Sequence, residues 1–356
     1  MSQSDSTAEF SRPASRRIDA RAQNNLAWRK LVAPFQQPSA ARATWQLANT
    51  LVPYFSLWAA MYFAKQISIW LTIPLAIIAA GFLVRTFIIF HDCAHGSFFK
   101  SHAANSITGF VTGMLTFTAF DHWRWEHTIH HRTAGDLDHR GAGGVWTMTV
   151  DEYLAASWKR RLGYRLVRHP LNLFVIAPLF VFAIRQRFAS ADAPSRERQS
   201  IRHMNFAVLC VVLAFVQVFG IGPYLLIQSI VLMVAGSVGL WLFYVQHQFE
   251  GVYWERSEDW SFTAAALRGS SYYQLPRVLQ FLSGNIGFHH VHHLSPRIPN
   301  YNLEKCHHSD RVFLQVKPIT LRASLRSLHF RLWDEQNKRL VSFAFIRELA
   351  RARVPG

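Results

Sequence analysis

Eight histidines fall in three short clusters, and their spacing is typical of metal ligands. Residues three or four apart share one face of a helix, so H-x-x-x-H presents two imidazoles side by side and H-x-x-H-H presents three. Imidazole is the commonest metal ligand in proteins, and eight imidazoles are too many for one ion. The clusters therefore predict a dinuclear metal site. The eight residues are His91, His95, His127, His130, His131, His289, His292 and His293.

Iron fits this ligand set best. Neutral imidazole suits iron, zinc and copper. A structural zinc ion takes only four ligands, and the sequence lacks the hydrolytic zinc motif H-E-x-x-H. Haem would use one or two axial histidines and leave the others unexplained. Histidine-bound iron with open positions suits the activation of dioxygen, so we expect two non-haem iron ions as the cofactor.

Acidic side chains beside the clusters are candidates for orienting the ligands. A metal-bound histidine usually donates its other ring N–H to a carboxylate or a carbonyl. Asp92 and Glu126 are the stronger candidates because they adjoin predicted ligands. The four acids with this predicted role are Asp92, Glu126, Asp136 and Asp138.

The remaining histidines near the clusters are judged by their position. His247 ends the last long apolar run on the same side as the clusters, so we predict it as a ninth ligand. His290 interrupts the third cluster and would point away from its neighbours on a helix, so we exclude it. His122 and His139 are weaker candidates.

Apolar runs must bring the clusters together at a membrane. Clusters that form one site lie on one side of the bilayer, so an even number of crossings separates them. Runs 107–120 and 171–184 are short for a span and are expected not to cross. Arg85 interrupts the second long run and is expected to reach toward the interface. The long runs cover residues 47–64, 71–90, 204–220 and 223–245.

This pattern predicts an all-α integral membrane protein. Four transmembrane helices would form two hairpins, and a cytoplasmic helical cap would carry the histidine-rich di-iron site. We expect a flexible basic N-terminal tail over residues 1–44, the membrane domain over 45–303 and a basic cytoplasmic C-terminal segment over 304–356, with an amphipathic helix around Leu321 and Leu325.

Composition and charge indicate which partners and which cellular location to expect. The net charge is +17, from 38 Lys and Arg against 21 Asp and Glu, and half of the residues are hydrophobic. The basic residues lie between and beyond the apolar runs, and no nucleic-acid motif is present, so lipid headgroups are the expected partner. The positive-inside rule places the site and both termini in the cytoplasm. Three widely spaced cysteines imply no disulfide framework, which suits that compartment.

Longer strings around the histidines resemble the membrane fatty acid desaturases, above all the acyl-lipid branch with its bacterial and delta-12/omega-6 members. The strings are HDCAH, WRWEHTIHHRTAGDLDHRG with VWTMTVDEY, QHQFEGVYWER and GNIGFHHVHHLSPRIPNYNL. The resemblance implies a di-iron centre, four spans facing the cytoplasm, and O2-dependent removal of two hydrogens from an acyl chain to give a cis double bond. It also implies that the eight clustered histidines and His247 are iron ligands, and that the bacterial inner membrane is the location.

Differences from other branches of the resembled family narrow the expected substrate and the expected electron donor. The first cluster is H-x-x-x-H rather than H-x-x-x-x-H, and the third begins with His289 rather than glutamine. Both features imply an acyl-lipid substrate. The haem motif H-P-G-G of a fused cytochrome b5 domain is missing, so the resemblance implies a separate carrier such as ferredoxin.

Two other kinds of protein remain as alternatives. A fatty acid hydroxylase, an alkane hydroxylase or a carotenoid ketolase would share the histidine boxes and differ in its product. A metal transporter or storage protein would need ionisable ligands inside the spans. Here the clusters lie at the ends of the apolar runs, which favours an enzyme.

Overall fold

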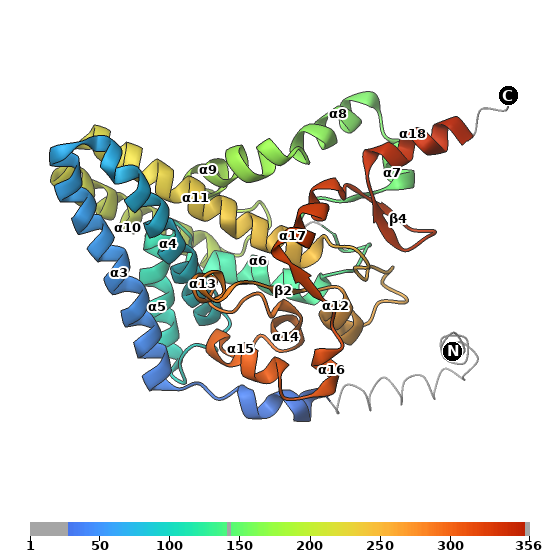
Figure 1. Cartoon of the computed structure of the whole chain (residues 1–356), viewed down its shortest axis with the longest axis horizontal. Helices are drawn as coiled ribbons and strands as arrows, with labels where there is room; N and C mark the ends of the chain where they lie inside the picture. Colours follow the sequence, from blue (N-terminus) through green and yellow to red (C-terminus); the bar gives the residue numbers. More distant parts are fainter. Residues whose placement is uncertain (1–27, 141–143, 353–356) are drawn as a thin grey trace.

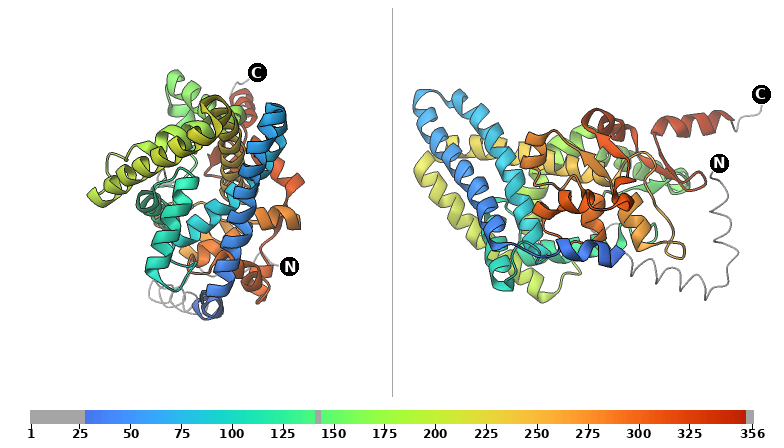
Figure 2. Two further views of the ribbon diagram at one scale, coloured as in Figure 1. Left: turned by 90° about the vertical axis from the view of Figure 1, so that its left-hand side faces the viewer. Right: turned by 60° about the horizontal axis from the view of Figure 1, so that its bottom comes forward.

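Two long helical hairpins meet a cap of shorter elements at one end (Figures 1 and 2). The structure is a computed structural model that describes residues 28–140 and 144–352. α4 packs against both α3 and α11 and so joins the two hairpins. The hairpins consist of α3 (Ala40–Ile67) with α4 (Thr72–Ala94), linked through η2 (Ile69–Leu71), and of α10 (Ser195–Phe219) with α11 (Ile221–His247).

Local sequence explains where these helices begin and end. The Ser39 hydroxyl caps α3 by accepting the Arg42 N–H at 3.4 Å. Gly220 has φ +80°, the left-handed conformation that glycine adopts without strain. A single residue can therefore end α10 and start α11.

Three of the described helices are long and apolar enough to cross a membrane. They comprise residues Ile69–Ala94, Ser195–Phe219 and Ile221–His247. The predicted run 47–64 lies within α3, which pairs with α4 over its length but is not among the three. The described part of the chain thus confirms a mostly helical protein with apolar spans, and the four-span topology stays a prediction.

The two short apolar runs form shorter helical segments. Run 107–120 lies mostly in α5 (His102–Leu115), which packs beside α4 and α10. Run 171–184 continues α8 (Trp158–Val167) after a bend of 53°, and the two parts together could count as one broken span. This second run comprises η3 (Asn172–Ile176), α9 (Ala177–Leu179) and η4 (Phe180–Ile184), followed by η5 (Arg185–Arg187).

The bent segment lies against α11 because glycine leaves room for it. A Cβ at Gly236 would stand 2.8 Å from the Pro178 Cβ and 3.1 Å from the Phe182 ring. Phe174 packs edge-on against Trp241 with 5.2 Å between the ring centroids. The segment therefore covers the part of α11 that leads to His247.

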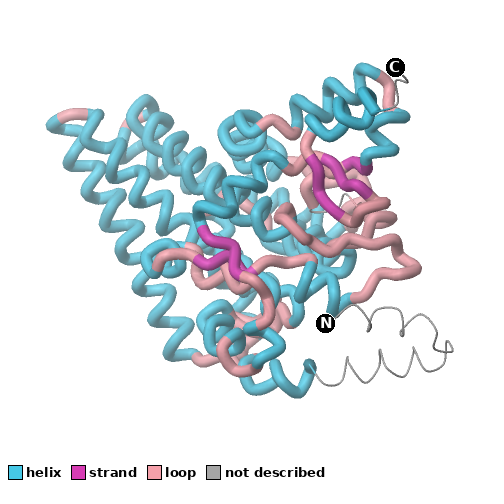
Figure 3. The backbone as a smooth tube through the Cα atoms, turned by 45° about the vertical axis from the view of Figure 1, so that its right-hand side comes forward, coloured by secondary structure: helices cyan, strands magenta, loops and turns pink. Residues whose placement is uncertain are grey.

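The cap combines short helices with two small sheets (Figure 3). β1 pairs with β4 in parallel and β4 with β5 antiparallel, while β2 and β3 form a separate parallel pair. The strands are β1 (Met148–Thr149), β2 (Tyr272–Gln274), β3 (Pro318–Thr320), β4 (Leu332–Asp334) and β5 (Arg339–Val341). The larger cap helices are α6 (Phe120–Thr133), α7 (Val150–Ala155), α12 (Phe262–Arg268), α13 (Arg277–Leu282), α14 (His289–Leu294), α15 (Asn300–His307) and α18 (Phe343–Ala352). The shorter ones are η1 (Ala33–Phe35), α16 (Arg311–Leu314), α17 (Leu321–Ser324) and η6 (Leu325–His329).

Both predicted terminal segments differ from expectation. Residues 28–44 pack on the cap: Val32 is fully buried, and Gln36 Nε2 donates to Ser295 Oγ at 2.8 Å. Residues 1–27 of the predicted tail lie outside the described residues. The predicted boundary at 303 falls inside α15, and β3 and β4 pair with strands of the central part of the chain. The C-terminal segment is therefore part of the same folded unit.

Arg85 also differs from expectation, because it is buried between helices. Its Nε donates to Thr50 Oγ1 at 3.0 Å, and its guanidinium lies 3.8 Å from the centre of the Phe281 ring. It donates to the Phe281 carbonyl as well. The side chain thus ties α4 to α3 and α13 instead of reaching toward an interface.

Candidate metal centre

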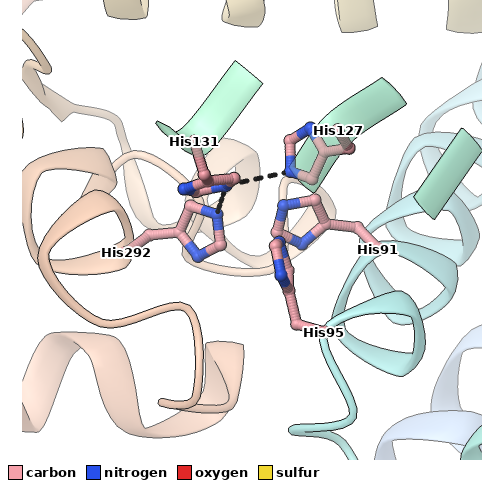
Figure 4. Close-up of side chains that lie close together, drawn as sticks. All are labelled: His91, His95, His127, His131 and His292. Atoms are coloured by element: carbon pink, nitrogen blue, oxygen red, sulfur yellow. Dashed lines mark hydrogen bonds between the residues drawn. The ribbon is translucent and has the colours of Figure 1, made fainter. Parts of the chain in front are cut away.

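Nine histidines converge where α4, α6, α11 and α14 meet, and they are the nine predicted as ligands. They form a group of five and a group of four, and within each group the candidate ligand atoms lie within 4.8 Å of one another. Figure 4 shows the group of five, whose rings point toward a common centre. This group comprises His91, His95, His127, His131 and His292. The group of four comprises His130, His247, His289 and His293.

Helical spacing distributes α6 between the two groups. His127 and His131 share a face, and their Nε2 atoms are 3.0 Å apart. His130 lies on the neighbouring face, with its Nε2 3.1 Å from the Nε2 of His247. His131 and His293 stack with ring centroids 4.2 Å apart, so the two groups are adjacent.

Helix α14 contributes histidines to both groups. The His292 Nε2 lies 3.0 Å from the His131 Nε2, and the His289 Nε2 lies 3.0 Å from the His247 Nε2. His290 points to the other side, where its Nε2 is 3.0 Å from the His307 Nδ1. Its exclusion from the ligand set therefore agrees with where its ring lies.

The ring nitrogens are arranged as metal ligands would be. Two imidazole nitrogens that face each other can share only one proton, and the His131 Nε2 faces two such partners at 3.0 Å. Further ring nitrogens of His95 and His293 are buried without a hydrogen-bond partner. Buried polar atoms without partners cost free energy, and an ion between the rings would satisfy them. The residues present therefore fit a bound metal.

Burial keeps these rings in the form that binds metal. Desolvation lowers the pKa of each histidine from α6 and α14 in the two groups well below its usual value, and neighbouring imidazoles lower it further. The imidazoles are thus neutral at pH 7, with lone pairs available for coordination.

Asp92 is well placed to orient a ligand. Its Oδ1 lies 3.1 Å from the His91 Nδ1, and the side chain is almost fully buried. Its Oδ2 accepts the Asn300 N–H at 2.5 Å and the Asn300 side-chain amide at 2.8 Å. A carboxylate held in this way fixes the His91 ring with its Nε2 free for a metal.

The other three acids have different partners among the described residues. Glu126 accepts hydrogen bonds from Arg185 at 3.2 Å and from Ser190 at 2.9 Å, and lies 3.5 Å from the His122 Nε2. Asp136 bonds His139 and Ser257, and Asp138 bonds Arg256. These acids therefore organise the cap around the site, and the two weaker histidine candidates, His122 and His139, pair with them.

Three contacts around the site were not anticipated. Asn300 supports Asp92 from a distance of 208 residues along the chain. The Gly269 carbonyl lies 3.4 Å from the His247 Nδ1 and can accept its proton. Trp123 stacks on His127 at 4.2 Å, one helical turn before it. Only the Trp123 spacing gave a signal in the sequence, because the other two partners meet through the tertiary fold.

An apolar cavity of about 250 Å³ borders both groups. It reaches His91 and His127 of the group of five and His289 of the group of four. Its walls come mainly from α4, α11 and the bent segment after α8, and include Phe87, Phe182, Leu232, Leu240 and Phe243. A flexible apolar molecule could lie here with one part beside the histidines.

Comparison with known proteins finds relatives that are fatty acid desaturases. Residues 68–322 match the family model for fatty acid desaturase. The chain is 48% identical over 320 residues to a fatty acid desaturase of Bacillus subtilis, covering 90% of this chain and 91% of that protein. It is 28% identical over 256 residues to an sn-1 oleoyl-lipid 12-desaturase of Synechocystis, covering 67% and 68%. It is 26% identical over 257 residues to a chloroplastic omega-6 fatty acid desaturase of Arabidopsis thaliana, covering 67% and 53%.

Proposed function

This chain belongs to the fatty acid desaturase family, and on that basis we propose that it introduces a cis double bond into an acyl chain of a membrane lipid at a centre of two iron ions. The observation that carries the proposal is the position of the apolar cavity, which borders both groups of buried histidines. The iron ions, when bound, would supply the O2 activation that the removal of two hydrogens from an unactivated chain requires.

All nine histidines are the proposed ligands of these ions. Nine imidazole rings from four helices, each buried or partly buried, give the density of nitrogen donors that a dinuclear site needs. Asp92 would fix the orientation of the His91 ring, and the Gly269 carbonyl would fix that of the His247 ring.

The cavity walls would decide which bond of the chain reacts. The Phe87 and Phe182 rings pack edge-on with their centroids 6.3 Å apart, and both line the space beside the histidines. Positioning of this kind can supply much of a rate acceleration, and small displacements are costly. The apolar lining would also keep bulk water away from the reacting carbons.

We propose an acyl-lipid substrate rather than a soluble thioester. The Synechocystis relative is named for its action on an oleoyl lipid. The first histidine cluster has the spacing expected for that branch, and the third begins with His289, as expected for it. The cavity is lined mainly by α4 and α11, two candidate spans, which places the proposed chain-binding space beside the apolar layer.

The proposed topology has four spans, with α3 as the fourth, and the histidine side in the cytoplasm of a bacterial cell. α3 has 28 residues and runs along α4, which supports its inclusion. The excess of Lys and Arg outside the apolar runs supports a cytoplasmic site and cytoplasmic termini. The 48% identical relative comes from a bacterium, which supports a bacterial location, and we propose the inner membrane.

Electrons are proposed to come from a separate carrier such as ferredoxin. The sequence has no haem motif of a fused carrier domain, and its net charge of +17 would favour association with an acidic protein.

The product should appear in the lipids of a bacterium that expresses this chain in air. We expect a new unsaturated fatty acid, absent when O2 is withheld, because desaturation consumes O2. Gas chromatography–mass spectrometry with derivatised double bonds would detect it and locate the new bond. A hydroxylated acid in its place would contradict desaturation and indicate a hydroxylase on the same scaffold.

The purified protein should contain close to two iron ions per chain, because the histidines form two adjacent groups. Elemental analysis by inductively coupled plasma mass spectrometry would measure this ratio. A ratio of one, or a preference for zinc after expression in iron-rich medium, would contradict the dinuclear iron assignment.

Filling the cavity should block the reaction. Gly239 lines the cavity, and a Cβ there would meet no atom within 4 Å, so Gly239→Phe should insert its ring into the space for the chain. We expect product formation to fall on the order of a hundredfold, the cost of a misplacement of about 1 Å. Iron content should stay unchanged.

The matched control for this variant is Gly222→Phe. Gly222 also has no atom within 4 Å of its Cβ position, but it lies at the start of α11, far from the cavity. Equal activity of the two variants would show that the cavity does not hold the acyl chain.

A further inference from the structure

Helix α8 presents an apolar strip that the described chain leaves uncovered. Trp158, Leu162 and Leu166 are 70%, 49% and 60% exposed. They are spaced four residues apart and therefore share one face of the helix. Three large apolar side chains in a row are costly to leave in water, so we expect them to be covered by something outside the described residues.

The opposite face of α8 is firmly held, so the strip points outward in a fixed direction. Tyr164 is fully buried, accepts the Met148 N–H at 3.1 Å and donates to the Arg331 carbonyl. Its ring packs edge-on against Trp146 with centroids 5.0 Å apart. This packing fixes α8 to the sheet formed by β1, β4 and β5.

Contacts at the end of α8 fix its depth relative to the spans. Arg168 donates from Nη2 to Gln248 Oε1 at 3.0 Å and to the Tyr244 hydroxyl at 3.3 Å. Tyr244 lies in the last turn of α11, at the histidine end of a candidate span. α8 is therefore at the level where that span leaves the apolar layer.

The strip continues into the segment that follows α8. Leu171, Ile176, Phe180 and Ile184 are all exposed, and they lead along α11 toward the cavity. An apolar strip that is continuous with the surface of candidate spans is expected to face the same environment as those spans, namely lipid.

Basic side chains flank the strip. Lys159 and Arg165 lie on either side of it, and the neighbouring Arg160 is exposed as well. The nearby acid Glu152 is paired with Arg140 at 2.5 Å, so it does not neutralise them. Trp and Leu on one face with Lys and Arg at its borders are the composition of a helix that lies in a membrane surface.

We propose that α8 lies in the headgroup layer of the membrane and binds anionic phospholipid through the flanking Lys159 and Arg165, with Trp158, Leu162 and Leu166 inserted among the acyl chains. This site is separate from the metal centre and does not depend on the reaction catalysed. It would hold the bent segment, and with it the wall of the cavity, at a fixed depth.

Nitroxide labels on α8 test the depth of the strip in nanodiscs of phosphatidylcholine mixed with phosphatidylglycerol. The background is Cys210→Ser, because Cys93 and Cys306 are buried. A label at Leu162→Cys should collide more with O2 than with a water-soluble nickel chelate. A label at Arg160→Cys, away from the strip, should show the reverse.

Analysis of co-purified lipid tests whether the basic side chains of α8 bind anionic phospholipid. After reconstitution in the same mixture and mild extraction, Lys159→Gln/Arg165→Gln should retain less phosphatidylglycerol than the parent protein, by up to roughly fivefold for each basic side chain lost. The matched control, Lys317→Gln/Arg322→Gln, removes two exposed basic residues elsewhere in the cap and should leave retention unchanged.

Each other outcome overturns part or all of the proposal. A label at position 162 that the nickel chelate reaches as easily as position 160 would place the strip in water. A deep label without preferential retention of phosphatidylglycerol would remove the anionic lipid site. A label that becomes shielded only when an acidic electron carrier is added would assign the strip to a protein partner.

Discussion

Replacing His131 with alanine should abolish the unsaturated product while the protein remains in the membrane. The His131 Nε2 lies 3.0 Å from the Nε2 atoms of both His127 and His292, and its ring stacks on His293 of the other group. Loss of this ring removes one ligand and opens the boundary between the two groups. We expect a decrease of more than about a hundredfold, because losing a residue that merely orients a ligand already costs about 10–100-fold.

Product analysis and iron content should change together in this variant. Gas chromatography of the lipids measures the product, and elemental analysis of the purified protein measures the iron. His139→Ala is the matched control, since His139 is largely exposed and pairs with Asp136 rather than with either group. If His131→Ala kept its product, the second cluster would not be part of the reaction centre.

Replacing Asp92 with asparagine should lower product formation by about 10–100-fold. Asp92 accepts hydrogen bonds on both oxygens, from His91 at one and from Asn300 at the other. Asparagine has only one side-chain oxygen. Its NH2 group would therefore face a hydrogen-bond donor, either the His91 ring N–H or the Asn300 N–H groups. The His91 ring would then lose its fixed orientation, or the link to α15 would break.

The readout for Asp92→Asn should separate metal binding from substrate binding. We expect a lower kcat and weaker iron retention against a chelator, with an unchanged KM because Asp92 does not line the cavity. Asp151→Asn, on the exposed side of α7, is the control. A selective increase in KM would contradict the proposed role in orienting His91.

The local part of the metal centre could be predicted from sequence, and the tertiary part could not. Spacing within one helix predicted that His127 and His131 share a face and that His290 points away from the other ligand candidates. Such predictions succeed because the geometry of a helix depends only on neighbouring residues. The division into groups of five and four depends on how α6 faces α11 and α14, which no local pattern contains.

The acids show the same division. Asp92 and Glu126 both adjoin proposed ligands, yet only Asp92 among these two contacts one in the described structure. Arg185, 59 residues further along the chain, binds the Glu126 carboxylate instead. Adjacency in sequence could not reveal that competing partner.

The fold differed from expectation where distant residues meet. The described residues 28–44 look like the end of a polar tail, but Ser39 donates its N–H to the Tyr301 hydroxyl at 2.9 Å, across 262 positions. Apolar runs predicted helices well because each run carries its own signal. They could not predict that residues near both ends of the chain pack beside the site.

The contribution of α14 to both histidine groups has a consequence for biosynthesis. His292 belongs to one group and His289 and His293 to the other, so neither group is complete until the ribosome has added nearly 300 residues. A metal ion bound by either group could therefore be fully coordinated only after α14 has been made. Under the proposed function, loading with metal would be a late step of maturation, and a nascent chain interrupted before α14 would carry part of each histidine group and neither group complete.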